Sequence, residues 1–249
     1  MKYKVEKVHP YSANHSKKKQ MEHLFNNIGP TYDKLSRTFS LGIDYYWRSD
    51  ALKELRKYPH KKILDIATGT GNFAIIAQKI LQPKQIIAVD ICPQMLQICQ
   101  QKVNEKGLQD TITFEKQDCA NLSYPDNSFD SVITCFGIRN FEDIDKSIQE
   151  ALRVLKPGGL FLSLELTKPE NTPMKQLHMI YCRYIIPALS HILNSDEHSY
   201  DYLLSSIAAF PQGREMMLIL KKNGFTNIRL RRYTLGVVTL YLAEKPVEE

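Results

Sequence analysis

Short apolar runs alternate with amphipathic stretches from residue 61 onward. Strand-like apolar runs occupy 62–67, 85–90, 111–117, 129–135 and 159–167. Apolar residues at helical spacing fill the intervals at 71–82, 93–107 and 143–156. A strand that is joined to the next one through a helix runs parallel to it, with a right-handed crossover. The pattern therefore predicts an α/β fold with a parallel sheet that helices cover on both faces.

The first 58 residues stand outside this alternation. Residues 1–19 are polar and end in Lys17–Lys19, which predicts a flexible, solvated tail. Residues 20–58 carry apolar side chains at helical spacing, with breaks at Gly29–Pro30 and Ser40–Gly42. We expect this segment to form an N-terminal helical lid over the domain that follows.

Residues 59–249 are expected to form one domain with additions to its alternating core. A long, largely helical insert interrupts the alternation at 172–210, and another helix is expected at 213–223. The apolar runs 227–233 and 237–243 are separated by a short turn and predict a hairpin. Such a hairpin adds an antiparallel strand to the edge of the sheet.

Composition narrows the class of protein only modestly. The 249 residues carry a net charge of +6, which requires no nucleic acid but suits an anionic membrane surface. The five cysteines are odd in number and form no C-x-x-C pair, so we expect a reducing cytoplasm. The seven histidines fall at no metal-ligand spacing, so no metal site is expected. No apolar run is long enough to span a bilayer, and no secretory signal opens the chain.

A glycine-rich turn follows the first strand and points to a bound nucleoside. Gly69, Thr70 and Gly71 connect the apolar run 62–67 to a helix, where backbone N–H groups can approach a ligand. The next strand ends in Asp90, placed to accept hydrogen bonds from ribose hydroxyls. The same spacing satisfies the loose dinucleotide pattern, so a nicotinamide-dependent dehydrogenase stays open at this point.

Three further features favour a different nucleoside cofactor. Asp65 lies inside the first strand, where a buried carboxylate would bond the N–H groups of the glycine loop and fix its shape. The third strand ends in Asp118 and Cys119, a polar tip suited to the amino edge of an adenine. The turn Lys156–Gly159 leads into the fifth strand.

Together with the glycine loop, these features resemble the class I S-adenosylmethionine-dependent methyltransferases. The resemblance covers 61–168 and 213–245 and implies a Rossmann-like, seven-stranded sheet whose last strand is antiparallel. It implies that S-adenosylmethionine is the cofactor. The residues that it assigns to cofactor binding are Asp65, Gly69, Thr70, Gly71, Asp90, Asp118, Cys119 and Cys135.

Segments outside the cofactor region resemble a narrower family, the ubiquinone/menaquinone biosynthesis C-methyltransferases. They are Phe25–Asp33, Ser40–Arg48, Phe136–Phe141, Asn194–Leu203 and Phe210–Gln212. This resemblance spans about 20–245 and implies methyl transfer to a ring carbon of a prenylated hydroquinone. Demethylmenaquinol is the expected acceptor, with the ubiquinone-pathway benzoquinol second. The alternatives are a sterol, fatty-acid or small-molecule methyltransferase within the fold, a dehydrogenase, and a non-catalytic binding module.

The chemistry of this reaction indicates which side chains are needed. A phenol has a pKa of about 10, so the site must favour its phenolate before the ring carbon can attack. Arg139 is the first candidate to stabilise that anion, and Tyr32 and Asp33 are candidates to close over the cofactor or orient the quinol. Cys135 stands where family members commonly have serine, and its thiol is a poor hydrogen-bond donor.

The isoprenoid tail of such a substrate requires an apolar site. A stripe of apolar residues near helical spacing runs through the insert: Met174, Leu177, Ile180, Tyr181, Tyr184, Ile185, Leu189 and Ile192. Core packing is the default for such a stripe, and a lid on the membrane surface is the alternative. We expect a cytoplasmic enzyme, peripheral at the membrane, and the sequence leaves a homodimer open.

Overall fold

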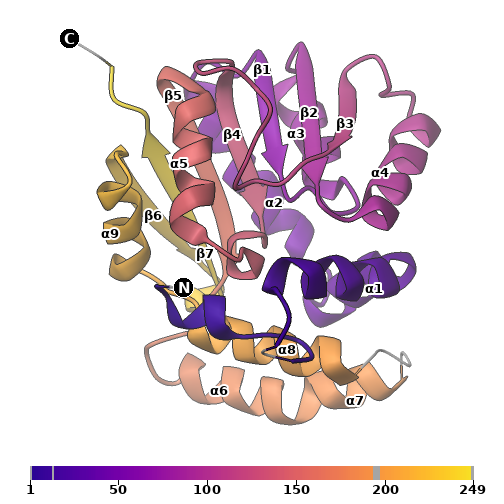
Figure 1. Ribbon diagram of the computed structural model, residues 1–249. Coiled ribbons are helices and arrows are strands. Elements are labelled where there is room, and N and C mark those ends of the chain that lie inside the picture. Colours follow the sequence, from indigo (N-terminus) through magenta and orange to yellow (C-terminus); the bar gives the residue numbers. More distant parts are fainter. Residues whose placement is uncertain (1, 13, 193–196, 248–249) are drawn as a thin grey trace.

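The computed structural model describes residues 2–12, 14–192 and 197–247, and Figure 1 shows their arrangement. A mixed sheet of seven strands has the order β3-β2-β1-β4-β5-β7-β6. The strands are β1 (Lys62–Ile66), β2 (Gln85–Asp90), β3 (Ile112–Lys116), β4 (Phe129–Cys135), β5 (Leu155–Leu166), β6 (Thr226–Tyr233) and β7 (Val238–Glu244). β7 pairs antiparallel with both β5 and β6, whereas the pairs among β1–β5 are parallel. The expected seven-stranded fold and its closing hairpin are confirmed.

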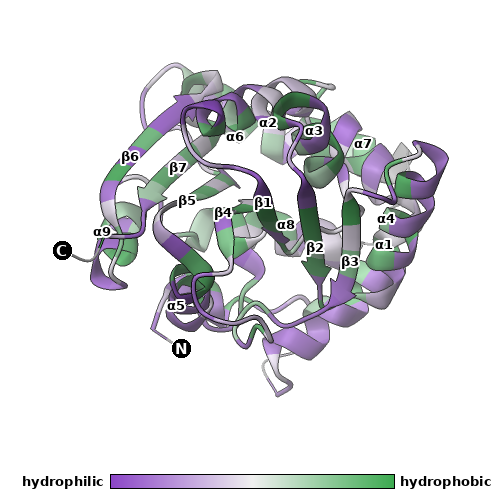
Figure 2. Cartoon of the chain, turned by 90° about the horizontal axis from the view of Figure 1, so that it is seen from above, coloured by the Kyte–Doolittle hydropathy of each residue, from purple (hydrophilic) through white to green (hydrophobic). Residues whose placement is uncertain are grey.

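Helices cover both faces of the sheet because each central strand is apolar on both sides. Ile63 belongs to one core cluster and Leu64 to the other, as the two-residue period of a strand requires. α5 (Ile144–Val154) and α9 (Arg214–Lys222) contribute to one cluster. The opposite cluster contains side chains from α2 (Asp44–Lys53), α3 (Asn72–Leu81) and α4 (Pro93–Glu105). In Figure 2 the central strands β1 and β2 are mostly hydrophobic.

A third layer of helices lies beyond the ends toward which β1 and β2 point (Figure 1). It consists of α1 (Lys17–Phe39) together with α6 (Met174–Ile180), a π-helical turn η4 (Tyr181–Ile185), α7 (Ile186–Ile192) and α8 (Glu197–Ala209). Met21 and Leu24 of α1 form a small core cluster with Tyr202 of α8. The N-terminal helix and the insert therefore pack on each other, although more than a hundred residues separate them. Their action as a lid stays a prediction.

The N-terminal segment corrects the expectation of a solvated tail. Residues Lys4–Lys7 form a short 3₁₀ helix, and Val5 and Glu6 are buried. Glu6 Oε1 accepts a hydrogen bond from the N–H of Ile144, at the start of α5. Lys17 is completely buried, and α1 begins there rather than at residue 20. The polar appearance of this segment misled the prediction because its polar groups bond partners that are distant in sequence.

Two expected breaks in secondary structure are also corrected. α1 continues through Gly29–Pro30, and a Cβ at Gly29 would lie 3.2 Å from side-chain atoms of Gln94 and Ile98. The glycine therefore permits close approach of α1 to α4 rather than ending a helix. β5 begins at Leu155, so Lys156–Gly159 lies within the strand, opposite a register shift in β4.

Candidate functional site

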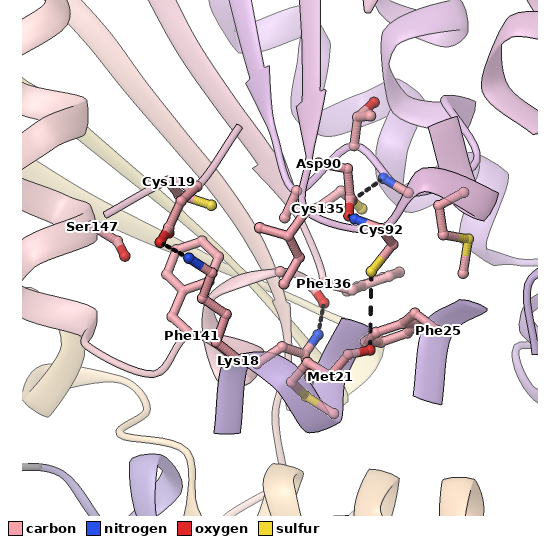
Figure 3. A pocket seen from close by; sticks show the side chains of 18 of the residues that line it. Lys18, Met21, Phe25, Asp90, Cys92, Cys119, Cys135, Phe136, Phe141 and Ser147 are labelled. Carbon is pink, nitrogen blue, oxygen red and sulfur yellow. Dashed lines mark hydrogen bonds and ion pairs between the residues drawn. The ribbon is translucent and has the colours of Figure 1, made fainter. Parts of the chain in front are cut away.

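Two neighbouring pockets open at the carboxyl edge of the sheet. The first is a cavity of about 460 Å³ next to the glycine loop, lined by polar and apolar side chains, and the second is a more apolar cavity of about 620 Å³ between α1, α2 and the insert. Phe25, Tyr32 and Phe136 line both cavities. These three aromatic residues therefore form a shared wall, and Figure 3 shows Phe25 and Phe136 near each other in the first pocket. A polar and an apolar ligand could meet across this wall.

The glycine loop shapes the inner side of the first pocket. Gly69 has φ +58°, and a Cβ there would meet no protein atom within 4 Å, so this glycine opens toward the cavity. Gly71 has φ +78°, and its Cβ would lie 2.4 Å from Cys99 Sγ. Gly71 does not line the pocket, contrary to prediction; it allows α3 to approach α4. Ala67 and Phe136 also have positive φ, of 54° and 61°, a strained conformation that is typical of functional sites.

Asp65 supports this loop from behind and does not line either pocket. Its Oδ2 accepts a 2.6 Å hydrogen bond from the Thr68 hydroxyl, whereas we expected it to bond the backbone N–H groups of the loop. Complete burial raises the pKa of Asp65 to about 7. The residue thus maintains the loop conformation without contacting the cavity.

Asp90 performs the backbone contact that was expected of Asp65. Its Oδ2 accepts from the N–H of Gly69 at 2.8 Å, and its Oδ1 accepts from the N–H of Cys92 at 2.9 Å. Asp90 lines the first pocket, as Figure 3 shows, and burial raises the pKa of its carboxyl. Each carboxylate oxygen has a second lone pair, which leaves acceptor capacity for ligand hydroxyls.

Asp118 and Cys119 line the first pocket, and their contact with adenine stays a prediction; Asp118 has a partner that the sequence did not reveal. The ammonium of Lys18 lies 2.5 Å from Asp118 Oδ2, and the N–H of Ala120 donates to Oδ1. This ion pair is partly exposed and joins the first turn of α1 to the end of β3.

Thr70 lines the first pocket, but its hydroxyl donates to Asp33 Oδ1 at 2.6 Å rather than into the cavity. Asp33 also accepts from Asn72 Nδ2 at 2.8 Å and from Lys102 Nζ at 2.7 Å. Asp33 lines neither pocket, so the structure does not bring it to the predicted catalytic position. It instead fastens α1 to the glycine loop and to α4.

Arg139 lines the second pocket next to the shared wall. Its Nη1 donates to the carbonyl oxygen of Phe136 and lies 3.4 Å from Glu165 Oε2, while its buried Nε has no partner among the described residues. Burial raises the pKa of Glu165 to about 7, against the lowering effect of Arg139. The guanidinium is therefore incompletely paired and faces an apolar cavity.

Cys135 and Tyr32 lie where the first pocket approaches the second. Burial raises the pKa of the Cys135 thiol to about 12, so this thiol is no nucleophile at neutral pH. Burial likewise raises the pKa of the Tyr32 phenol, which keeps that group protonated. Both side chains shape the junction of the two cavities.

Five residues of the insert stripe line the second pocket: Met174, Leu177, Ile180, Tyr181 and Ile185. No residue of α6 is buried, and Leu177 and Ile180 are 57% and 53% exposed although both line the cavity. The default prediction of core packing is thus wrong for these residues. The side chain of Ile192 lies outside the described part of the chain. So do residues 194–196, the start of the family-like segment Asn194–Leu203.

Arg48 of α2 is a buried charged residue of the first pocket that the sequence analysis did not propose as a site residue. Its side chain is 5% exposed, and it lies on the same helix face as the buried residues Ala51 and Leu52. The helical spacing of Arg48 from Ala51 and Leu52 could have indicated its role in the sequence, because an arginine on an apolar helix face requires a partner.

Comparisons with known proteins agree with this geometry. A model of the ubiE/COQ5 methyltransferase family matches residues 13–245. The chain belongs to this family. A protein of Bacteroides fragilis named demethylmenaquinone methyltransferase is 46% identical over 98% of this chain and 100% of its own length. A protein of the same name from Porphyromonas gingivalis is 39% identical, over 96% of this chain and 98% of its own length.

Solved structures support the fold. A S-adenosylmethionine-dependent methyltransferase from Thermotoga maritima superposes with a TM-score of 0.62 at 18% identity, covering 90% of this chain and 99% of that one. The [4+2]-cyclase SpnF superposes with a TM-score of 0.61 at 18% identity, covering 93% and 97%. The chain therefore has the class I methyltransferase fold and is an S-adenosylmethionine-dependent methyltransferase of the ubiE/COQ5 family.

No helix in residues 2–12, 14–192 and 197–247 is both long and apolar enough to cross a membrane. The same residues contain no cluster of three or more histidine, cysteine or acidic side chains that could hold a metal ion.

Proposed function

We propose that the protein transfers a methyl group from S-adenosylmethionine to a ring carbon of demethylmenaquinol, the step that its relatives' names describe. The observation that carries this proposal is the aromatic wall of Phe25, Tyr32 and Phe136, shared by a polar and an apolar cavity. Methyl transfer requires the donor sulfonium and the acceptor carbon to approach in line. Two pockets that adjoin at these three side chains suit two ligands whose reacting atoms come into contact there.

The residues of the first pocket fit the cofactor. Gly69 leaves room that a side chain would fill, and Asp90 retains acceptor capacity for ribose hydroxyls. Asp118 and the backbone at Cys119 lie at the end suited to adenine. When bound, the cofactor supplies an electrophilic methyl group on a good leaving group, so the protein contributes alignment and a competent nucleophile.

Arg139 is suited to make that nucleophile. A phenolate that develops in an apolar cavity is stabilised by a nearby guanidinium, and Arg139 lines this cavity with only a long contact of 3.4 Å to Glu165. Removing one such donor typically costs about 10²–10³ in turnover. We expect Arg139→Met to lower kcat by that order and to leave the affinity for S-adenosylhomocysteine within about twofold. Unchanged kcat would remove Arg139 from the chemistry.

The most informative experiment supplies tritium-methyl-labelled S-adenosylmethionine and, in separate reactions, demethylmenaquinol and the ubiquinone-pathway benzoquinol. Labelled menaquinol as the preferred product supports the proposal. Preference for the benzoquinol would reassign the acceptor.

Calorimetry with S-adenosylmethionine and with NAD, on the wild type and on Asp90→Ala, tests the cofactor. Because Asp90 is the expected acceptor for the ribose hydroxyls, its loss should weaken binding of whichever nucleoside is the true cofactor. Tight NAD binding instead would favour a dehydrogenase, and cofactor affinity without turnover would favour a binding module.

The second pocket is suited to the first part of an isoprenoid tail, and its rim is suited to a membrane surface. Exposed apolar side chains surround this pocket on α6 and η4 and at the turn between α1 and α2: Leu41, Ile43, Leu177, Ile180 and Ile185. Burial of such side chains at a bilayer interface is favourable. Flotation with anionic liposomes should therefore recover the wild type, and Ile180→Ser with Ile185→Ser should reduce recovery. Equal recovery of the two proteins would contradict membrane contact by this rim.

A further inference from the structure

Arg48 is a buried cation on the wall of the first pocket for which the reaction described above has no use. Its side chain is 5% exposed, and its Nε has no hydrogen-bond partner among the described residues. The nearest acid is Asp44, at a long 3.6 Å from Nη2. The guanidinium lies over the ring of Phe136, 5.3 Å from its centroid. Arg48 thus makes a cation–π contact with Phe136 and is incompletely paired.

Burying a charge without full hydrogen bonding is costly, so such a group indicates an anionic ligand. Two other cations, Lys18 and Lys146, line this pocket. Lys18 pairs with Asp118 at the end expected for adenine, and Lys146 is exposed on α5. Arg48 differs from both, because it is buried and lies over Phe136, at the boundary with the second pocket.

The proposed cofactor carries one anionic group, the α-carboxylate of its methionine portion, and its remaining groups are cationic or neutral. We infer that Arg48 binds this carboxylate. The inference rests on the proposed function, since it presumes S-adenosylmethionine in the first pocket. A planar guanidinium offers a fork of N–H donors that matches both oxygens of a carboxylate. The guanidinium lies over the Phe136 ring, and Asp44 is too distant to occupy its N–H donors fully.

A comparison of two ligands tests this role. S-adenosylhomocysteine contains the amino-acid carboxylate, whereas 5′-methylthioadenosine contains the same adenine, ribose and thioether without it. Calorimetry should find that Arg48→Met weakens S-adenosylhomocysteine binding about 10- to 100-fold, as expected for a charge-assisted hydrogen bond, and changes methylthioadenosine affinity less than about twofold. Arg48→Lys should give an intermediate loss. Arg56→Met is the matched control, because Arg56 is exposed and lines neither pocket, and it should change neither affinity.

Other outcomes overturn the inference in distinguishable ways. Equal weakening of both ligands in Arg48→Met would assign Arg48 to packing against Phe136. An unchanged affinity for S-adenosylhomocysteine with reduced turnover would assign Arg48 to the acceptor. If the wild type binds neither ligand, the cofactor assignment itself fails. If Arg48→Met does not fold, Arg48→Lys decides: equal effects of this variant on the two ligands would refute carboxylate recognition.

Discussion

Lys17 provides the sharpest test of the packing that the structure assigns to the N-terminal segment. Its side chain is completely buried, and Nζ donates to the carbonyl oxygens of Val5 at 2.7 Å and Arg139 at 2.9 Å. Burial lowers the pKa of Lys17 to about 7; the positive charge of Arg139 also lowers it, whereas Glu6 and Glu142 raise it. Lys17→Met removes this titration and keeps much of the apolar volume.

The sign of the effect follows from proton linkage. In the unfolded chain the lysine has its ordinary pKa of 10.5, so between about pH 7 and pH 10.5 the unfolded state binds more protons than the folded state. Stability therefore rises with pH across this window. Lys17 is half protonated in the folded protein near pH 7, so raising the pH to about 8.5 should add about 1.6 kcal/mol to the free energy of unfolding.

Urea denaturation near pH 7 and near pH 8.5 measures this gain for the wild type, Lys17→Met and Lys19→Met. Lys19 is an exposed residue of the same helix, so its variant should behave as the wild type. The difference between the wild type and Lys17→Met cancels contributions from all other groups. The gain should be missing only in Lys17→Met. An equal gain in all three proteins would refute the burial of a titrating Lys17.

The glycine loop and the Asp33–Lys102 ion pair beside it allow further tests. Gly71→Ala should destabilise the fold by about 1–3 kcal/mol, from positive φ and overlap with Cys99 Sγ, whereas Gly69→Ala should cost less stability and mainly weaken S-adenosylhomocysteine binding. Thermal unfolding beside calorimetry separates the two effects, and similar stability losses would contradict the packing role of Gly71. Asp33→Asn should cost about 0.5–1 kcal/mol, because its ion pair with Lys102 is partly exposed. A double-mutant cycle with Lys102→Met measures the coupling, and additive effects would show that no ion pair forms.

The alternating part of the chain was predictable because its signals are local. The glycine loop and Asp90 lie within one βαβ unit, β1-α3-β2, and helices that join successive strands predict their parallel direction. The terminal hairpin was recognised from two apolar runs around a short turn. These features depend on residues that are near each other in sequence, so a pattern of a few residues reveals them.

The errors concern partners that are distant in sequence. Lys17 is buried because it reaches carbonyl oxygens at Val5 and Arg139, and no local pattern reveals an acceptor 122 residues away. Asp33 was a candidate for catalysis because it follows Tyr32, yet Thr70 and Lys102 engage its carboxylate. In both cases the residue type was noticed and the partner was not.

The same long-range contacts explain how one helix serves both pockets. α1 contributes Phe25 and Tyr32 to the shared wall, and Asp33, one residue further on, accepts the hydroxyl hydrogen bond of Thr70 in the glycine loop. At its other end, Lys18 pairs with Asp118 on the opposite side of the first pocket. Because α1 is continuous between these contacts, it cannot move away from the first pocket without breaking one or both of them. The helix therefore holds two of the three side chains that line both cavities, a task that the sheet and the glycine loop alone do not perform.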